Sequence, residues 1–193
     1  MMKSYLLGID IGTSACKVAV FDRNGKVLAA ASGDYPVYYP HEGWAEQNPE
    51  EWWDAVCRAT KETIQKADIT ADEIAGIGID GQSWSAIPID REGNVLANTP
   101  IWMDTRAQSI CDRLNQEIGQ EEIFEVAGNS LQPSYSTAKI LWYKENLPEV
   151  YAKIHKILQS NSYIAFKLTG ALTQDVSQGY GLHCFNMKKG CWD

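Results

Sequence analysis

The residues best suited to chemistry lie in the first seventeen positions of the chain. Asp10 ends an apolar run, Gly12, Thr13 and Ser14 follow, and Lys17 opens a second apolar run. We expect a hairpin with a polar tip, in which Gly12 turns the backbone with positive φ and lets a ligand approach it. Asp10 is placed to hold Mg²⁺, which favours one or two carboxylates plus phosphates. Backbone N–H groups at the turn, the two hydroxyls and the lysine could bind phosphate oxygens.

An ordinary β-hairpin is the alternative interpretation of this stretch. Asp and Gly are common turn residues, so Asp10 and Gly12 could serve the turn alone.

A second stretch repeats the order of the first. Residues 74–80 are a continuous apolar run that ends on Asp80, and Gln82, Ser83 and Trp84 follow. Such a run predicts a buried strand beside the first one. If both tips lie at the same edge of a sheet, they converge on one cleft.

Turn and helix signals indicate the elements that position these tips. Residues 22–25 read Asp-Arg-Asn-Gly, and residues 27–31 then continue an antiparallel meander as a third strand. The similar string at residues 90–93 is interpreted as one hairpin solution used twice. Asn48 and Pro49 predict the start of a helix that covers the sheet. Its packing face is predicted to hold Trp53, Val56, Thr60, Ile64 and Ala67.

The second half of the chain is predicted to be mostly helical. An amphipathic helix should follow Arg106, with Ala107, Ile110, Cys111, Leu114 and Ile118 on one side. Further helices are expected over residues 121–127, 137–146 and 160–168. Residues 175–181 are expected to be a loop or a short helix. The pattern as a whole indicates an α/β fold with a helical insertion.

Composition narrows the class of protein. The 193 residues are 45% hydrophobic and 22% charged, as in soluble globular proteins. The net charge of −8 argues against nucleic acid as a partner. No run reaches the length of a membrane span, and no signal peptide is recognised, so a cytoplasmic location is expected. The five cysteines and three histidines are scattered, which suggests neither a disulfide framework nor a zinc site.

The polar tip at residues 10–14 resembles the first phosphate loop of the actin, hexokinase and Hsp70 superfamily. Within it, the chain most resembles the amino-terminal half of FGGY carbohydrate kinases, over nearly its whole length. The matching strings, in order, are Gly8–Ser14, Trp44–Pro49, Ile101–Arg106, Lys139–Trp142, Leu168–Gly170, and Asp175–Ser177 followed by Trp192.

The resemblance implies an RNase-H-like α/β domain with a mixed sheet flanked by helices. It implies ATP and Mg²⁺ as cofactors and a sugar as substrate. Asp10 would orient the metal as the catalytic carboxylate of this domain, while Gly12, Thr13, Ser14 and Lys17 would address the phosphates. In the family, the general-base carboxylate belongs to the start of a second domain, beyond this chain. Residues 1–193 are therefore expected to be the sugar-binding side of the cleft, nearly inactive alone.

The substrate side is expected to combine apolar faces with a few placed polar groups, as a sugar site does. Trp84 and Trp102 could stack on the sugar, with polar contacts from Gln82, Ser83, Asp104 and Arg106. Alternatively, Trp102 is core, and Asp104 with Arg106 is a salt bridge capping the next helix. For Lys139, Trp142, Asp175 and Ser177, structural and ligand-binding roles both stay open.

The identity of the sugar is less constrained than its class. Xylulose kinases usually carry Gly-Gln-Met-His where this chain has Gly-Gln-Ser-Trp at residues 81–84. Xylulose or a related ketose or polyol is expected. The alternatives are a non-catalytic sugar-binding or regulatory domain and an actin-like structural protein that binds ATP. An apolar face left bare for a partner domain also predicts self-association, in a possible homodimer.

Overall fold

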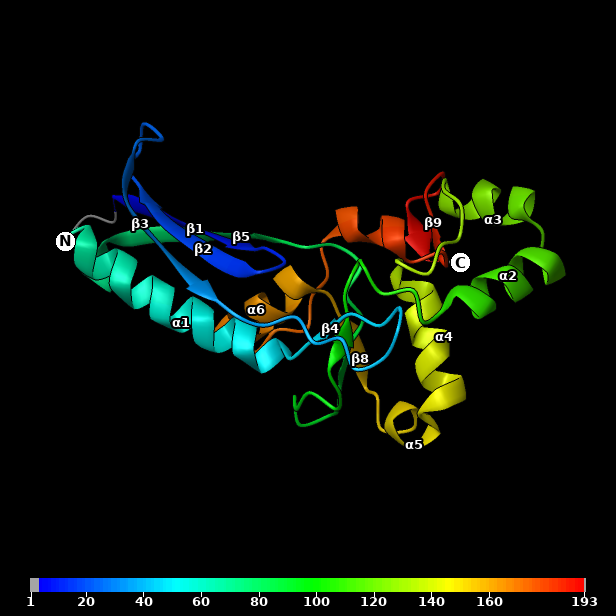
Figure 1. The fold of residues 1–193 in the computed structure, drawn as a ribbon. Helices are drawn as coiled ribbons and strands as arrows, with labels where there is room; N and C mark the ends of the chain where they lie inside the picture. The colour runs from blue at the N-terminus through cyan, green and yellow to red at the C-terminus, as the bar shows by residue number, and fades with distance from the viewer. Residues whose placement is uncertain (1–3, 193) are drawn as a thin grey trace.

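The fold is organised around a four-stranded mixed sheet. The computed structural model describes residues 4–192, and its sheet has the order β3-β2-β1-β5 (Figure 1). The strands are β1 (Tyr5–Ile11), β2 (Ala15–Phe21), β3 (Val27–Asp34) and β5 (Ile74–Gly81). β1, β2 and β3 form an antiparallel meander, and β5 pairs parallel to β1. The predicted hairpin, third strand and neighbouring strand are confirmed.

Two helices cover the same face of this sheet. α1 (Pro49–Lys66) packs on β2 and β3, and α6 (Ser160–Thr169) packs on β5 and β1. Figure 1 shows both helices on one side of the strands, with α1 running along the sheet. The core between these layers contains alternate residues of each strand, which is the pattern that a half-covered sheet requires. Its sheet residues include Leu7, Ile9, Ile11, Val18 and Val20.

The start of α1 is as predicted, but its packing face is not. Asn48 caps the helix by accepting a hydrogen bond from the backbone N–H of Glu50. The fully buried aromatic is Trp52, whereas Trp53 is only half-buried. The predicted packing face, which began at Trp53, was therefore wrong: the buried face of the helix is shifted by about one residue, to Trp52. The small residue Ala55 lets the helix approach the sheet on the Trp52 side, since a Cβ on Gly33 would lie 2.9 Å from the carbonyl oxygen of Ala55.

β5 also differs from its prediction in its burial. None of its eight residues is buried in the structure, although its sequence is apolar. The strand lies at the edge of the sheet, and α6 covers only one of its faces. Apolar composition indicated the pairing with β1 correctly, but the expectation of a buried strand was wrong.

Two short ladders carry the segments between the sheet and the helices. β4 (Glu46–Gln47) pairs with β7 (Thr99–Pro100), and β6 (Ile87–Ile89) pairs with β8 (Lys156–Leu158), both antiparallel. A single 3-10 turn, η1 (Ala71–Glu73), precedes β5.

The remaining elements form a largely helical region beside the sheet (Figure 1). They are α2 (Gln108–Glu117), α3 (Gln120–Ala127), α4 (Ser136–Asn146), α5 (Pro148–Tyr151), the 3-10 helix η2 (Val176–Gly181), and the short strands β9 (Phe185–Asn186) and β10 (Cys191–Trp192). The predicted helices are confirmed within one or two residues at their ends. Of the helices described in residues 4–192, none has the length and apolarity needed to cross a membrane.

The two similar turn strings adopt the same conformation. Gly25 and Gly93 have φ of 81° and 89°, in the left-handed region that favours glycine. The carboxylates of Asp22 and Asp90 each accept two backbone hydrogen bonds from within their own turn. The interpretation as one hairpin solution used twice is confirmed.

Candidate functional site

The tip between β1 and β2 is a tight turn, but Gly12 serves it differently from the prediction. Its φ does not lie in the left-handed region, so the expectation of a positive φ was wrong. Glycine is instead required by space, because a Cβ at this position would lie 2.9 Å from the carbonyl oxygen of Ala15. Its N–H donates to that same oxygen and is not free for a phosphate.

The next two residues keep their backbone donors available. Among residues 4–192, no protein acceptor receives a hydrogen bond from the N–H of Thr13 or Ser14. Two free N–H groups at the end of a hairpin form the kind of concavity that binds an anion.

Buried and half-buried side chains hold the tip from behind. The hydroxyl of Tyr35 donates to the carbonyl oxygen of Gly12 at 2.6 Å, and burial raises its pKa. The side-chain amide of Gln47, which is fully buried, donates to the carbonyl oxygens of Thr13 and Pro36. The tip is therefore a fixed feature that does not need a ligand to order it.

The face of the sheet opposite α1 carries the charged groups. Asp10 faces Lys17 across the β1–β2 pair and Asp80 across the β1–β5 pair. The Asp10 carboxylate lies 3.9 Å from the Lys17 amine. All three residues line one end of an open groove of about 600 Å³, and residues such as Gly8, Ala19 and Gly78 form its floor.

Carboxylate oxygens are the donors that suit Mg²⁺, so this pair of aspartates fits the ion that the resemblance implies. In residues 4–192 no group of three or more His, Cys, Asp or Glu residues is arranged to hold a metal. A metal here would keep water or phosphate as its other ligands, as Mg²⁺ commonly does in nucleotide sites.

Trp84 is held in an unusual backbone conformation. Its φ is 67°, which is uncommon for a residue other than glycine. Its N–H donates to the side-chain oxygen of Gln159, and its ring packs edge-on against Tyr135, 4.7 Å away between centroids. A non-glycine residue in this region is under strain and keeps it only when the surroundings fix it.

The polar residues before Trp84 are already engaged by the protein. The side-chain amide of Gln82 donates to Gln47, and the Gln82 carbonyl accepts from the hydroxyl of Ser160. Its own side-chain oxygen is buried and has no partner among the described residues. Ser83 lies 3.5 Å from the side-chain amide of Gln178.

Trp102 joins the predicted substrate side to the predicted phosphate tip. Its indole Nε1 donates to the hydroxyl of Thr13 at 3.0 Å, although the residues lie 89 positions apart. Its side chain is 44% exposed, so it is not a core residue. The exposed ring can still receive a ligand on its face.

Asp104 and Arg106 belong to a buried network. The Arg106 guanidinium bonds both oxygens of Asp104 and one of Glu46, and it stacks 3.8 Å above the centroid of Trp44. Asp104 also accepts from the N–H of Ala45. The two side chains are almost fully buried, so the structure favours a salt bridge over direct contact with a sugar. That salt bridge ties two segments together and does not cap α2.

The residues for which structural and ligand-binding roles both stayed open lie in α4 and at the start of η2. Lys139 and Trp142 are buried in α4, which favours a structural role for both. Asp175 begins η2 and accepts hydrogen bonds from Ser177 and Asn161. Burial would raise the pKa of Asp175, but these hydrogen bonds outweigh it and lower the pKa.

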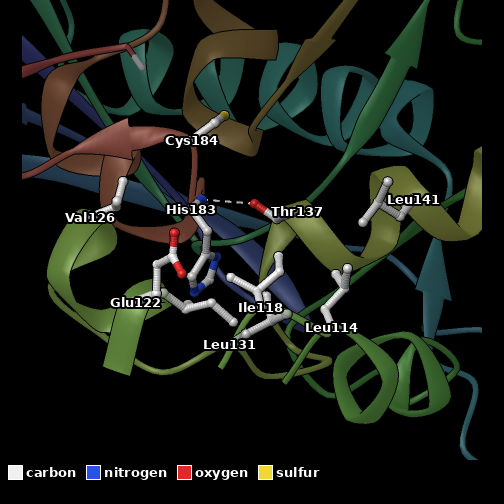
Figure 2. Close-up of a pocket in the computed structure, with 10 residues that line it drawn as sticks. Leu114, Ile118, Glu122, Val126, Leu131, Thr137, Leu141, His183 and Cys184 are labelled. Atoms are coloured by element: carbon white, nitrogen blue, oxygen red, sulfur yellow. Dashed lines mark hydrogen bonds between the residues drawn. The ribbon is translucent and has the colours of Figure 1, made fainter. Parts of the chain in front are cut away.

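A separate apolar cavity of about 340 Å³ lies between α2, α3, α4 and the chain at His183 (Figure 2). Figure 2 shows Leu114, Ile118, Leu131 and Leu141 around it. None of the site residues predicted from the sequence lines this cavity. Burial lowers the pKa of His183, which favours the neutral imidazole in this apolar setting.

Three residues that were assigned no role from the sequence also shape the site. Asp80 had a signal, because its apolar run ends on an acid as the first one does. Gln47 lies in the matching string Trp44–Pro49, which gave it no role, and Gln159 had no signal, since the contacts of a buried glutamine depend on the fold. Gln47 links Gln82 to Thr13, and Gln159 holds Trp84.

Comparisons with known proteins identify the family of the chain. Residues 5–193 match the family described as "FGGY family of carbohydrate kinases, N-terminal domain". A xylulose kinase of Bacillus subtilis is 32% identical over 188 residues, which cover 97% of this chain and 38% of the relative. The chain thus spans well under half the length of that kinase.

Solved structures show the same fold. The gluconate kinase of Lactobacillus acidophilus matches with a TM-score of 0.91 and 32% identity, over 98% of this chain and 38% of its own. The glycerol kinase of Plasmodium falciparum, solved with ADP, matches with a TM-score of 0.90 and 25% identity, over 98% and 39%. Because the family match covers nearly every residue, the chain belongs to the FGGY family of carbohydrate kinases, as their N-terminal domain.

Proposed function

We propose that this chain is the sugar-binding and phosphate-facing half of a kinase that transfers phosphate from Mg²⁺-ATP to a hydroxyl of xylulose or a related ketose or polyol. The observation that carries the proposal is the hydrogen bond from Trp102 to Thr13, 3.0 Å long. It places a half-exposed aromatic ring, suited to a sugar face, beside a turn suited to phosphate. Phosphoryl transfer needs these two sites to adjoin.

Each part of the tip has its own task in this proposal. The free N–H groups of Thr13 and Ser14 bind phosphate oxygens, and Lys17 neutralises their charge. Asp10, with Asp80 beside it on the neighbouring strand, holds Mg²⁺. The bound metal supplies charge stabilisation for the transferring phosphate. Trp84 and Trp102 form the apolar walls for the sugar, and the Gln82 side chain offers polar contact.

Asp104 and Arg106 act on the sugar indirectly in this proposal. Their buried network fixes the segment that carries Trp102 against residues 44–46. The three relatives described above are named for different substrates: xylulose, gluconate and glycerol. The proposal therefore commits to the reaction class first and to xylulose as the first sugar to try.

Calorimetric titration of the 193-residue chain with pentuloses, hexuloses, polyols and sugar acids tests the proposal. We expect saturable binding of one sugar, binding of Mg²⁺-ATP at the tip, and little turnover without the family's second domain. Asp10→Asn should weaken Mg²⁺-nucleotide binding at least tenfold, about 1.4 kcal/mol, and leave sugar affinity unchanged. A folded chain that binds none of the sugars would contradict the proposal.

A further inference from the structure

Lys139 is a buried lysine with no exposed surface, placed in the middle of α4. Lysine is rarely buried, because taking its amine out of water is costly unless the lost hydrogen bonds are replaced. The contacts of its amine therefore indicate what it does. Two charged side chains act on this amine. The negative charge of Asp104 favours its protonated form, and the positive charge of Arg106 disfavours it.

The amine bonds two segments that are distant in sequence. Nζ of Lys139 donates to the carbonyl oxygen of Trp84 at 2.7 Å and to that of Ile101 at 2.9 Å. These are the loop after β5 and the loop after β7. An amine has at least two N–H donors whether it is charged or neutral, so both bonds are available in either state.

At Trp84 the amine makes the second of two side-chain hydrogen bonds that hold the backbone of a strained residue. Lys139 bonds the carbonyl, Gln159 accepts from the N–H, and the backbone between them has a φ of 67°. Such a conformation is strained and persists only where the surroundings enforce it. Both backbone polar groups of Trp84 are therefore hydrogen-bonded to buried side chains from outside its loop.

At the other end, the amine acts next to Trp102. The carbonyl it bonds belongs to Ile101, the residue that precedes Trp102. The same carbonyl accepts from the N–H of Asp104, which shapes the turn that presents the Trp102 ring. The indole of Trp102 in turn bonds Thr13 at the tip.

We infer that Lys139 is a positioning residue that sets the separation of Trp84 and Trp102, the two aromatic walls of the sugar site, without touching the sugar. The position of the sugar in this inference rests on the proposed function. The coupling of the two loops through Lys139 does not depend on that function. Removing the amine releases both loops together, because each loses a bond to the same atom.

Amide hydrogen exchange of the 193-residue chain tests the coupling directly. The N–H groups of Trp84 and Asp104 report on the two loops, since both are hydrogen-bonded in the structure. In Lys139→Met, which keeps the unbranched side chain as far as Cε and loses the amine donors, we expect both amides to exchange at least tenfold faster, with β1 and β2 unchanged. Lys144→Met, at an exposed position of the same helix, is the matched control and should change neither.

Three results would overturn the inference. They are unchanged exchange at both amides, faster exchange at only one of them, and a uniform increase across the domain, which would indicate a merely structural lysine. Lys139→Arg retains donors and should restore slow exchange at both amides at least in part. Its failure to do so, in a folded variant, would also contradict a role based on hydrogen bonding.

Binding measurements connect the coupling to the site. For the sugar that the wild type binds, Lys139→Met should raise Kd about tenfold or more, while Kd for Mg²⁺-ATP stays within about twofold. An equal loss for both ligands would contradict a role specific to the sugar walls. If the wild type binds no sugar, the proposed function fails, whereas the exchange result still decides whether Lys139 couples the loops.

Discussion

Trp84 fits so closely against the backbone of η2 that one neighbouring residue has to be glycine. A Cβ on Gly181 would lie 2.4 Å from Cδ1 of the Trp84 ring. Tyr135 packs against the same ring edge-on, and Tyr180 lies near it at 6.5 Å between centroids. With its backbone gripped on both sides, the ring has little room to adjust.

Gly181→Ala should therefore displace Trp84 and weaken sugar binding. Overpacking of this kind typically costs about 1–3 kcal/mol, so we expect stability to fall by that order and Kd for the sugar to rise about tenfold. Gly78→Ala is the control, since a Cβ there meets no atom within 4 Å. Calorimetry and urea denaturation of both variants measure the effect. Equal sugar affinity in the two variants would show that Trp84 does not form a wall.

Lys139 should also make stability depend on pH. Burial is the main cause that lowers the pKa of Lys139 from 10.5 to about 7; the Asp104 charge opposes this effect and the Arg106 charge adds to it. Between these two values the unfolded chain holds a proton that the folded chain lacks, so the free energy of unfolding rises with pH across the window. Below pH 7 both states are protonated, and the full penalty applies.

The expected gain from pH 7 to pH 9 is about 2 kcal/mol of unfolding free energy, relative to Lys139→Met. Urea denaturation of wild type, Lys139→Met and Lys144→Met at both pH values measures it. The wild type and Lys144→Met should gain together. A pH-independent difference between wild type and Lys139→Met would show that the amine keeps its charge in the folded state.

Residue types in the sequence predicted the kind of chemistry better than they predicted the contacts. Asp10 and Lys17 lie together as predicted, and Trp102 lies at the tip. Asp104 and Arg106, in contrast, have the same side chains that a sugar site would use, yet they bond each other in the core. Only the fold decides whether a polar side chain faces solvent or a partner.

At the scale of elements, α1 shows how local signals can define an element and misplace its face. The cap at Asn48 and the acidic first turn define where the helix starts. Two adjacent tryptophans then leave its rotation open, since either could anchor the face. The small residue Ala55 resolves it, because it lets the helix approach β3 closely at Gly33.

Trp52→Ala and Trp53→Ala should therefore differ strongly in their effect on stability. Loss of the fully buried Trp52 ring is expected to cost about 3–5 kcal/mol, as for other buried aromatics. Loss of the half-buried Trp53 ring should cost clearly less. Denaturant unfolding monitored by circular dichroism compares them. A greater loss for Trp53→Ala would restore the face predicted from the sequence.

At the scale of the molecule, the sheet is covered on one side only. Figure 1 shows no helix of the described chain over the face opposite α1. On that face Ala30, Ala19, Gly8 and Gly78 form a row of small residues across all four strands. Leu6 and Val27 on this face are each about half exposed. An apolar surface of this kind favours association.

We expect the 193-residue chain to self-associate through this open face. Ala30→Glu places a charge on it and should shift the population toward monomer in sedimentation velocity. Ala171→Glu adds the same charge at an exposed position after α6 and should leave association unchanged. A wild type that sediments as a clean monomer across concentrations would refute the prediction.

The sequence specified the order and class of elements well, because turn signals and periodicity are local. The edge position of β5, the β6–β8 pairing and the path of the helical region depend on contacts between distant segments. Local pattern cannot encode these. The same holds for the site: the tip of β1 and β2 was predictable, whereas the links through Gln47, Gln159 and Lys139 were not.

The bond between Trp102 and Thr13 has an optical consequence. The fluorescence of an indole depends on the hydrogen bond that its N–H makes. A phosphate that binds at Thr13 would therefore change the fluorescence of Trp102. Trp102 is then a built-in fluorescent reporter placed at the tip. Six other tryptophans contribute a background that the difference spectrum against Trp102→Phe removes. Nucleotide arrival could thus be followed in real time without attaching a label.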